Sequence, residues 1–113
     1  ELKVRLFDEV KELLSDFTKT DEYLDYLCSK IREAARFADG EEMTIYISPS
    51  DKEKQTELEK RTGMTITISE YDFMGGMRAV IRGRNILIDH SFQAAVDYEY
   101  HQFSFAAGGA GIE

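Results

Sequence analysis

The feature that most constrains the fold is a predicted β-hairpin in residues 77–88. Two apolar runs rich in β-branched residues, at 77–81 and 86–88, flank the sequence Arg-Gly-Arg-Asn at 82–85, where glycine and asparagine tolerate the positive φ of a tight turn. Gly75 and Gly76 precede the first strand, where the chain must turn sharply or pass close to another backbone. Residues 89–91 can supply the oxygen that caps a following helix, so the second strand is expected to lead directly into one.

Two amphipathic helices are predicted ahead of the sheet. Three-to-four spacing predicts a first helix up to about Asp16, and no capping residue precedes it, so we expect residues 1–16 to be the end of a longer helix. Its apolar positions are Leu2, Leu6, Val10, Leu13, Leu14 and Phe17. Thr20 or Asp21 caps a second helix that ends near Gly40. Its apolar side carries Leu24, Leu27, Cys28, Ile31, Ala35 and Ala38. Cys28 is therefore interpreted as a small core residue.

The centre of the chain alternates between strands and helices. The pattern of residues 43–48 predicts a strand. Residues 51–61 predict a short polar helix with one apolar anchor, Leu58. A capping box formed by Ser50 and Glu53 should begin this helix, and Gly63 should be its C-cap. Residues 64–69 alternate as a half-buried strand does, so the two strands should form a parallel pair.

A last helix follows the hairpin, and residues 106–113 should be a flexible tail. The expected class is α+β, a small mixed four-stranded sheet packed with helices in the order α-α-β-α-β-β-β-α, with residues 1–105 forming one globular domain.

Composition excludes several classes of function. The 113 residues carry 14 Lys and Arg against 22 Asp and Glu, and a net charge of -8 repels phosphate backbones and anionic lipids. One cysteine excludes an internal disulfide, and with two distant histidines it makes a poor zinc site. No apolar run approaches the roughly 20 residues that span a bilayer. A cytoplasmic setting without metal or cofactor is expected.

Few residues invite a catalytic interpretation. Asp89 and His90 are adjacent, but neighbours leaving a strand point in different directions, so Asp89 is interpreted as a helix cap. His101 is read as a partly buried or solvent-facing imidazole. Gly75 and Gly76 open a strand rather than a helix, and the Gly-Lys-Ser/Thr sequence of a phosphate-binding loop is absent from the chain. No catalytic residue is therefore expected.

Three arginines on the hairpin are the candidate partner-docking residues. Strand periodicity places Arg78 and Arg82 on one face, opposite the apolar residues of the same strand, and Arg84 lies in the turn. They form either a solvated face paired with neighbouring carboxylates or a docking patch for an acidic protein surface.

The succession of these features resembles the C-terminal domain of the E subunit of the V/A-type ATP synthases. The resemblance rests on a double glycine opening a strand, a short turn, and a second strand that enters the terminal helix. The matching residues are Gly75, Gly76, Ile86, Ile88, Asp89, His90, Ser91 and Phe92. Weaker agreement extends upstream to about Asp21.

This resemblance implies a non-catalytic peripheral-stalk, or stator, subunit of a proton- or sodium-translocating ATPase, peripheral to the membrane. The implied partners are a second small stalk subunit, reached through the upstream helix, and the nucleotide-binding subunits. One alternative is a regulator of the related secretion or flagellar export ATPases. A different class is a small single-stranded nucleic-acid module using Tyr46 and the three arginines, against which the net charge argues. An enzyme is the third alternative.

Overall fold

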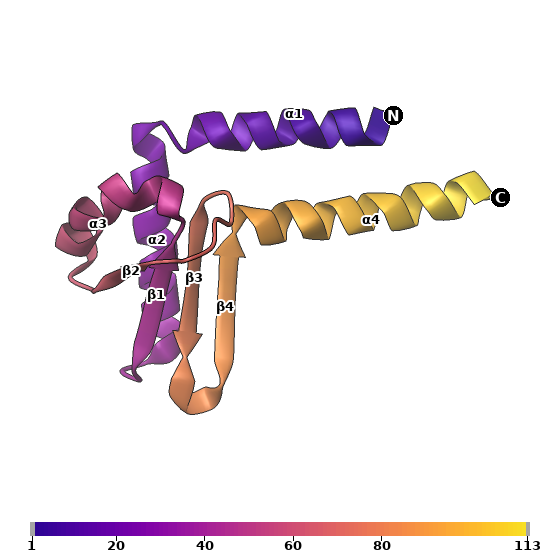
Figure 1. The fold of residues 1–113 in the computed structure, drawn as a ribbon. Helices are drawn as coiled ribbons and strands as arrows, with labels where there is room; N and C mark the ends of the chain where they lie inside the picture. The colour runs from indigo at the N-terminus through magenta and orange to yellow at the C-terminus, as the bar shows by residue number, and fades with distance from the viewer. Residues whose placement is uncertain (1, 113) are drawn as a thin grey trace.

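The computed structural model describes the backbone of residues 2–112 and the side chains of residues 2–103. Within them lie α1 (Leu2–Phe17), α2 (Asp21–Ala38), β1 (Met43–Ile47), the 3₁₀ helix η1 (Pro49–Lys54), α3 (Gln55–Thr62), β2 (Ile66–Ile68), β3 (Gly76–Ile81), the 3₁₀ turn η2 (Arg82–Arg84), β4 (Ile86–Ser91) and α4 (Phe92–Ile112). This arrangement, shown in Figure 1, confirms the α+β class and the predicted order of elements.

The sheet is mixed, with strand order β2-β1-β3-β4. β1 and β2 are parallel and are connected through η1 and α3, whereas β3 is antiparallel to both β1 and β4. Gly63 ends α3 in the left-handed conformation that was predicted, with φ of 70°. The predicted parallel pair and hairpin are thus both present.

Alternation along the strands separates a buried face from an open face. Ile45, Ile47 and Met77 are buried on the face that α2 covers, where they meet Leu27 and Ile31. Figure 1 shows α2 behind the sheet, while only the segment 69–75 crosses in front of it. The front face carries the remaining, partly exposed strand residues.

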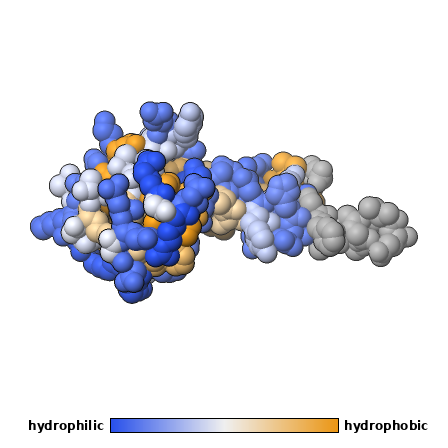
Figure 2. Space-filling view, turned by 90° about the horizontal axis from the view of Figure 1, so that it is seen from below, coloured by the Kyte–Doolittle hydropathy of each residue, from blue (hydrophilic) through white to orange (hydrophobic). Residues whose placement is uncertain are grey.

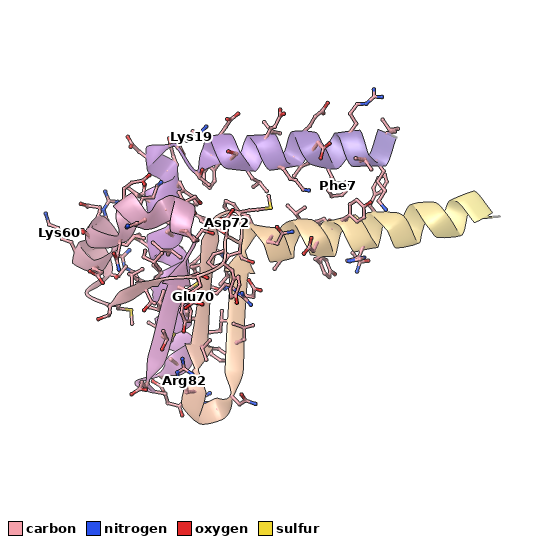
Figure 3. All side chains as sticks on the ribbon, in the orientation of Figure 1. Phe7, Lys19, Lys60, Glu70, Asp72 and Arg82 are labelled. Carbon is pink, nitrogen blue, oxygen red and sulfur yellow. The ribbon has the colours of Figure 1, made fainter. Side chains whose placement is uncertain are left out.

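Helices α1 and α4 form an arm beside the sheet. Figure 1 shows them side by side and antiparallel, with both chain ends at the far end of the arm, and the molecule measures 52 × 32 × 22 Å. Phe7 points from α1 toward α4, as Figure 3 shows. Its ring packs edge-on against Tyr100 and Phe103, at centroid distances of 5.1 and 5.9 Å. Lys3 lies 3.8 Å above the Tyr100 ring.

The structure confirms part of the predicted apolar side of α1, since Leu14 and Phe17 pack against the core. The buried residue is Phe7, which was not predicted, whereas the predicted Leu2, Leu6 and Leu13 are exposed by 76%, 42% and 68%. A single neighbouring helix covers only a narrow strip of α1, so these three leucines stay outside the contact.

An aromatic cluster lies where the arm joins the sheet. It consists of Phe17, Tyr23, Tyr26 and Phe92, with ring centroids 5.6 Å apart for Phe17 and Tyr23 and 5.8 Å apart for Tyr23 and Phe92. Residues from the end of α1, the start of α2 and the start of α4 therefore meet at one point.

The hairpin is longer than predicted, and among the predicted capping residues 89–91 the cap is Ser91 rather than Asp89. β4 extends through residues 89–91, and Arg82–Arg84 form a 3₁₀ turn ended by Asn85 at φ of 55°. Asp89 does not cap α4: the hydroxyl of Ser91 accepts the Ala94 N–H instead, at 3.1 Å. The strand continues because Asp89 pairs in register with Arg78 of β3.

The predicted capping box of Ser50 and Glu53 is wrong. Pro49 begins a 3₁₀ helix, and no side chain caps it. The Ser50 hydroxyl lies 3.5 Å from an Asp72 carboxylate oxygen. Leu58 is fully buried, as predicted, but Asp51 is buried as well, at 2% exposure.

The C-terminal stretch extends beyond the described side chains. The backbone of α4 runs to Ile112, while the side chains from 104 onward and residue 113 lie outside the described part. The flexible tail and the single-domain boundary therefore stay predictions. Among the described residues, no helix combines the length and apolar character needed to cross a bilayer.

Candidate functional site

Arg78 lies at the middle of the open sheet face. Its Nε is 3.5 Å from the Oδ2 atom of Asp89, the residue opposite it on β4, and its guanidinium carbon lies 5.8 Å from the centre of the Phe73 ring. The Nε atom is buried and makes no hydrogen bond. Arg78 is thus held between an acid and an aromatic ring, with one donor unused.

The other two hairpin arginines lie elsewhere. Arg82 leaves the strand in η2 and is exposed at the hairpin tip, where Figure 3 labels it, with no ion pair to another described residue. Arg84 pairs with Glu41, in the turn between α2 and β1, and its guanidinium lies 6.0 Å from the Phe37 ring. The structure therefore spreads the three predicted docking residues over the open face, the tip and the α2 side.

Neighbouring residues at the end of β4 face in different directions, as predicted. Asp89 faces Arg78, whereas His90 has its Nε2 4.0 Å from a carboxylate oxygen of Glu33 on α2. The two are not an acid–base pair. Cys28 is buried at 2% exposure, which confirms its interpretation as a core residue. Among the described side chains, no three His, Cys, Asp or Glu gather as metal ligands.

A buried polar group links α2, η1 and β3. The Tyr23 hydroxyl donates to Oδ2 of Asp51 at 2.5 Å and accepts the Gly76 N–H at 2.8 Å. Lys54 lies 3.4 Å from the other oxygen of Asp51. Burial, and then the hydrogen bond to Asp51, raise the pKa of the Tyr23 hydroxyl. Burial also raises the pKa of the Asp51 carboxyl, against the opposing effect of Tyr23 and Lys54.

Strongly shifted pKa values in a cleft often indicate a functional site. Here Tyr23 is fully buried and Asp51 is 2% exposed, and their hydrogen bonds are directed at each other and at the backbone. The group therefore fixes the packing of three elements. Sequence reasoning missed both residues.

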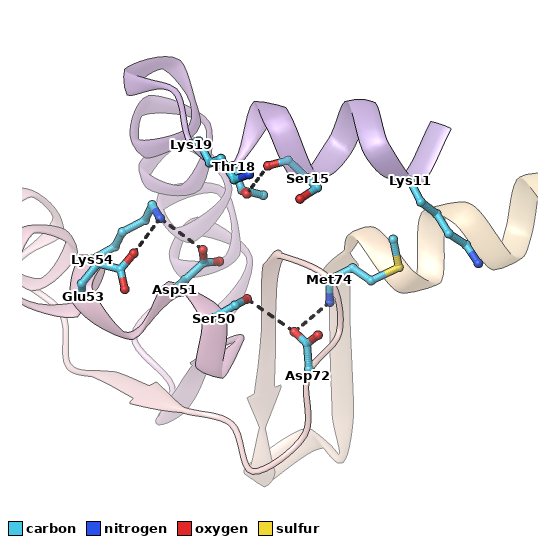
Figure 4. A pocket seen from close by; sticks show the side chains of 10 residues that line it. All are labelled: Lys11, Ser15, Thr18, Lys19, Ser50, Asp51, Glu53, Lys54, Asp72 and Met74. Atoms are coloured by element: carbon cyan, nitrogen blue, oxygen red, sulfur yellow. Dashed lines mark hydrogen bonds and ion pairs between the residues drawn. The ribbon is translucent and has the colours of Figure 1, made fainter. Parts of the chain in front are cut away.

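A polar pocket of about 380 Å³ lies above this group, between the end of α1, η1 and the loop at 72–74. Lys11 of α1 and Lys19, in the turn after α1, belong to its lining, and Figure 4 shows Lys54 held by Glu53 and Asp51. Asp72 adds a further carboxylate on the opposite wall. Because three lysines face three carboxylates, the lining is close to neutral and does not select a phosphate group.

Together the fold and these surfaces define a class of protein: a small α+β domain joined to a helical arm. Figure 2 views the hairpin end and shows mainly hydrophilic residues with smaller hydrophobic areas between them. The features that distinguish its surface are the arm and the open sheet face. Such a domain fits a role in assembly.

Comparison with known proteins identifies the relatives. The chain is 31% identical over 96 residues to the E subunit of the A-type ATP synthase of Saccharolobus islandicus, covering 82% of this chain and 48% of the relative. It is 25% identical over 91 residues to the E subunit of the A-type ATP synthase of Pyrobaculum neutrophilum, covering 80% and 48%. An E subunit of the V-type ATP synthase of Clostridium tetani is 24% identical over 91 residues, covering 80% and 46%.

These matches confirm the resemblance found in the sequence: the chain is homologous to the E subunits of A-type and V-type ATP synthases. No family model matches the chain. The chain spans about half the length of the curated relatives it matches. The matched region thus corresponds to one part of each of these longer relatives.

Proposed function

We propose that this chain forms the head of a non-catalytic peripheral-stalk subunit, which holds the nucleotide-binding subunits of a rotary V/A-type ATPase against the turning rotor. The homology to ATP synthase E subunits over 82% of the chain carries the proposal. The arm supports it, because α1 and α4 project together from the head and offer a rigid attachment for a stalk.

The test uses the full-length protein in its source cells. We expect an affinity-tagged protein to co-purify with the ATPase subunits. Deletion of the region described here should lower the number of ions transported per ATP hydrolysed. Without this anchor, the nucleotide-binding subunits would turn together with the rotor. A deletion complex that couples transport to hydrolysis as tightly as the wild type would contradict the proposal.

The exposed side of α1 is the proposed contact for the second small stalk subunit. Leu2, Leu6 and Leu13 lie at helical spacing and are 42–76% exposed. A paired helix could bury them, and each buried leucine contributes about 1.5 kcal/mol or more. The three hairpin arginines, Arg78, Arg82 and Arg84, stay candidates for contact with the nucleotide-binding subunits.

Changing both Leu6→Glu and Leu13→Glu in the full-length protein is expected to weaken binding to the stalk partner by about a hundredfold, since two buried leucines are lost. Binding can be measured by titration calorimetry with the purified partner. Phe37→Glu is the matched control, because Phe37 is 54% exposed but lies on α2. If the double variant and the control bind the stalk partner with equal affinity, the partner does not contact this side of α1.

The purified chain is expected neither to bind nor to hydrolyse ATP. Its glycines form no phosphate-binding loop, and the polar pocket beside α1 has balanced charges. Phosphate release and nucleotide binding can be measured on the fragment alone. ATP turnover that follows the protein through successive chromatographic steps would refute a purely structural role.

A further inference from the structure

The open face of the sheet contains a groove of about 600 Å³. Tyr46, Arg78 and Val80 lie along it, and Tyr71 and Leu87 belong to its lining from the crossing segment and from β4. Strand register explains this arrangement. Arg78 is paired with Tyr46 on one side and Asp89 on the other, and Val80 is paired with Leu87, so all of these side chains point to the same face.

The groove exposes large apolar side chains at its border. Tyr71 is 76% exposed and Leu87 is 51% exposed, while Val80 and Tyr46 are half-buried between them. Single exposed apolar residues are ordinary, but here several border one depression on a face that no described helix covers.

Arg78 determines which chemical group the groove can bind. Its Nε is shielded from solvent without a hydrogen-bond acceptor, and Asp89 at 3.5 Å is the only described carboxylate paired with it. The buried Phe73 ring lies 5.8 Å from its guanidinium carbon, within the range of a cation–π contact. A charged donor that is partly desolvated and incompletely paired binds an incoming carboxylate more strongly than a solvated one does.

We propose that this groove is the docking site for a segment of a partner protein that places an apolar side chain between Tyr71 and Leu87 and a carboxylate on Arg78. The inference rests on the proposed function, which makes another subunit of the same complex the source of that segment. Arginine matches the planar shape of a carboxylate with two parallel donors, so its charge fixes the register of the segment.

The surrounding charges favour a single carboxylate over a polyanion. Glu70 lines the groove and Asp89 lies beside Arg78, within a chain of net charge -8. A nucleic-acid strand brings one negative charge with every nucleotide, so repulsion increases along its length, whereas a protein segment brings one charge at one position.

Photo-crosslinking in the assembled complex tests the position of the groove. Full-length protein carrying benzoylphenylalanine in place of Leu87 is incorporated into the ATPase complex and irradiated. We expect a crosslink to another subunit, within a segment that contains an apolar residue and an Asp or Glu. The same photoreactive residue in place of Lys60, exposed on α3, is the control and should give no such crosslink.

Substitution of Arg78 tests the chemistry. We expect both Arg78→Gln and Arg78→Lys to weaken binding of the full-length protein to stalk-free ATPase about tenfold, because lysine keeps the charge but loses the planar pair of donors. Arg36 is exposed on α2 and does not line the groove, so Arg36→Gln should bind as the wild type does. Thermal unfolding of each variant checks that the fold is kept.

The outcomes separate the two proposals. Failure of the wild-type protein to join any ATPase complex overturns the proposed function. Three other outcomes overturn the proposal that the groove is a docking site and leave the proposed function standing. They are normal assembly with no crosslink at Leu87, a crosslink only to a second copy of this chain, and wild-type affinity in both Arg78 variants.

Discussion

Replacing Gly76 with alanine is expected to destabilise the domain by about 4 kcal/mol or more, among the largest effects of a single substitution. Gly76 has φ of +80°, and an added Cβ would lie 2.2 Å from the carbonyl oxygen of His90 and 3.0 Å from the Cα of Ser91. Both atoms are backbone atoms of the paired strand β4. They cannot move away without disrupting the ladder between β3 and β4, so most of a small domain's stability is lost.

Gly63→Ala separates the steric clash from backbone strain. Gly63 also has a positive φ, of +70°, but an added Cβ there meets no atom within 4 Å. Only the left-handed conformation is penalised, by about 1 kcal/mol. Urea unfolding followed by circular dichroism measures both variants. If Gly76→Ala costs no more than Gly63→Ala, the close approach of β3 and β4 does not require glycine.

The second large effect is expected at Tyr23. Tyr23→Phe removes the hydroxyl that donates to Asp51 and accepts the Gly76 N–H, and the lost ring substituent leaves two buried polar groups incompletely paired. We expect a loss of about 3 kcal/mol in the free energy of unfolding, since an unsatisfied buried carboxylate is costly. Tyr26→Phe is the matched control, because Tyr26 is in the same aromatic cluster but is not bonded to Asp51.

The carboxylate of Asp51 should also give the domain a pH dependence of unusual sign. Its pKa is raised in the folded protein, chiefly by burial, so the folded state binds a proton more tightly than the unfolded state does. The resulting stabilisation is fully present below the unfolded pKa, about 3.9, and is lost as the pH rises through the folded value.

Comparison with Asp51→Asn isolates this contribution, because asparagine does not titrate. The free energy of unfolding of the wild type, minus that of the variant, should increase as the pH falls from neutral toward 4 or so. Urea titrations at several pH values measure the difference. A difference that decreases over this range would show that Asp51 is stabilised as the charged form.

Local patterns were sufficient where one residue type decides the backbone. The hairpin, the C-cap at Gly63 and the alternation of β1 follow from φ preferences and strand periodicity, and all are found. The capping box at Ser50 failed because Pro49 starts a 3₁₀ helix and Asp51 turns inward to meet Tyr23, a partner 28 residues away. Rules based on neighbouring residues cannot predict a contact between residues so far apart in the sequence.

A signal for Tyr23 was nonetheless present in the sequence. Tyr23, Leu27 and Ile31 recur every four residues on α2, which places the tyrosine on the buried side, and a buried tyrosine hydroxyl requires a partner. The same periodic reasoning found the helix α1 but not which of its apolar residues are buried, because it identifies an apolar side and not the strip that α4 covers.

For the candidate docking residues, too, local patterns predicted some features and not others. Strand alternation correctly placed Arg78 opposite Met77 and Ala79, but the sequence did not contain the register that sets Asp89 beside it. Arg82 lies outside the strand because η2 begins there. The groove at Tyr71 and Leu87 depends on a connection that crosses the sheet, and such a path is decided by topology rather than by local sequence.

The paired helices of the arm behave mechanically as a composite beam. When a sideways load bends the arm, one helix is placed in tension and the other in compression, provided that they cannot slide past each other. Phe7, wedged against Tyr100 and Phe103, supplies that shear connection, and the aromatic cluster around Tyr23 is the fixed end. Without the Phe7 ring, the two helices would slide past each other more easily, so part of the bending stiffness of the arm comes from one side chain far from the sheet.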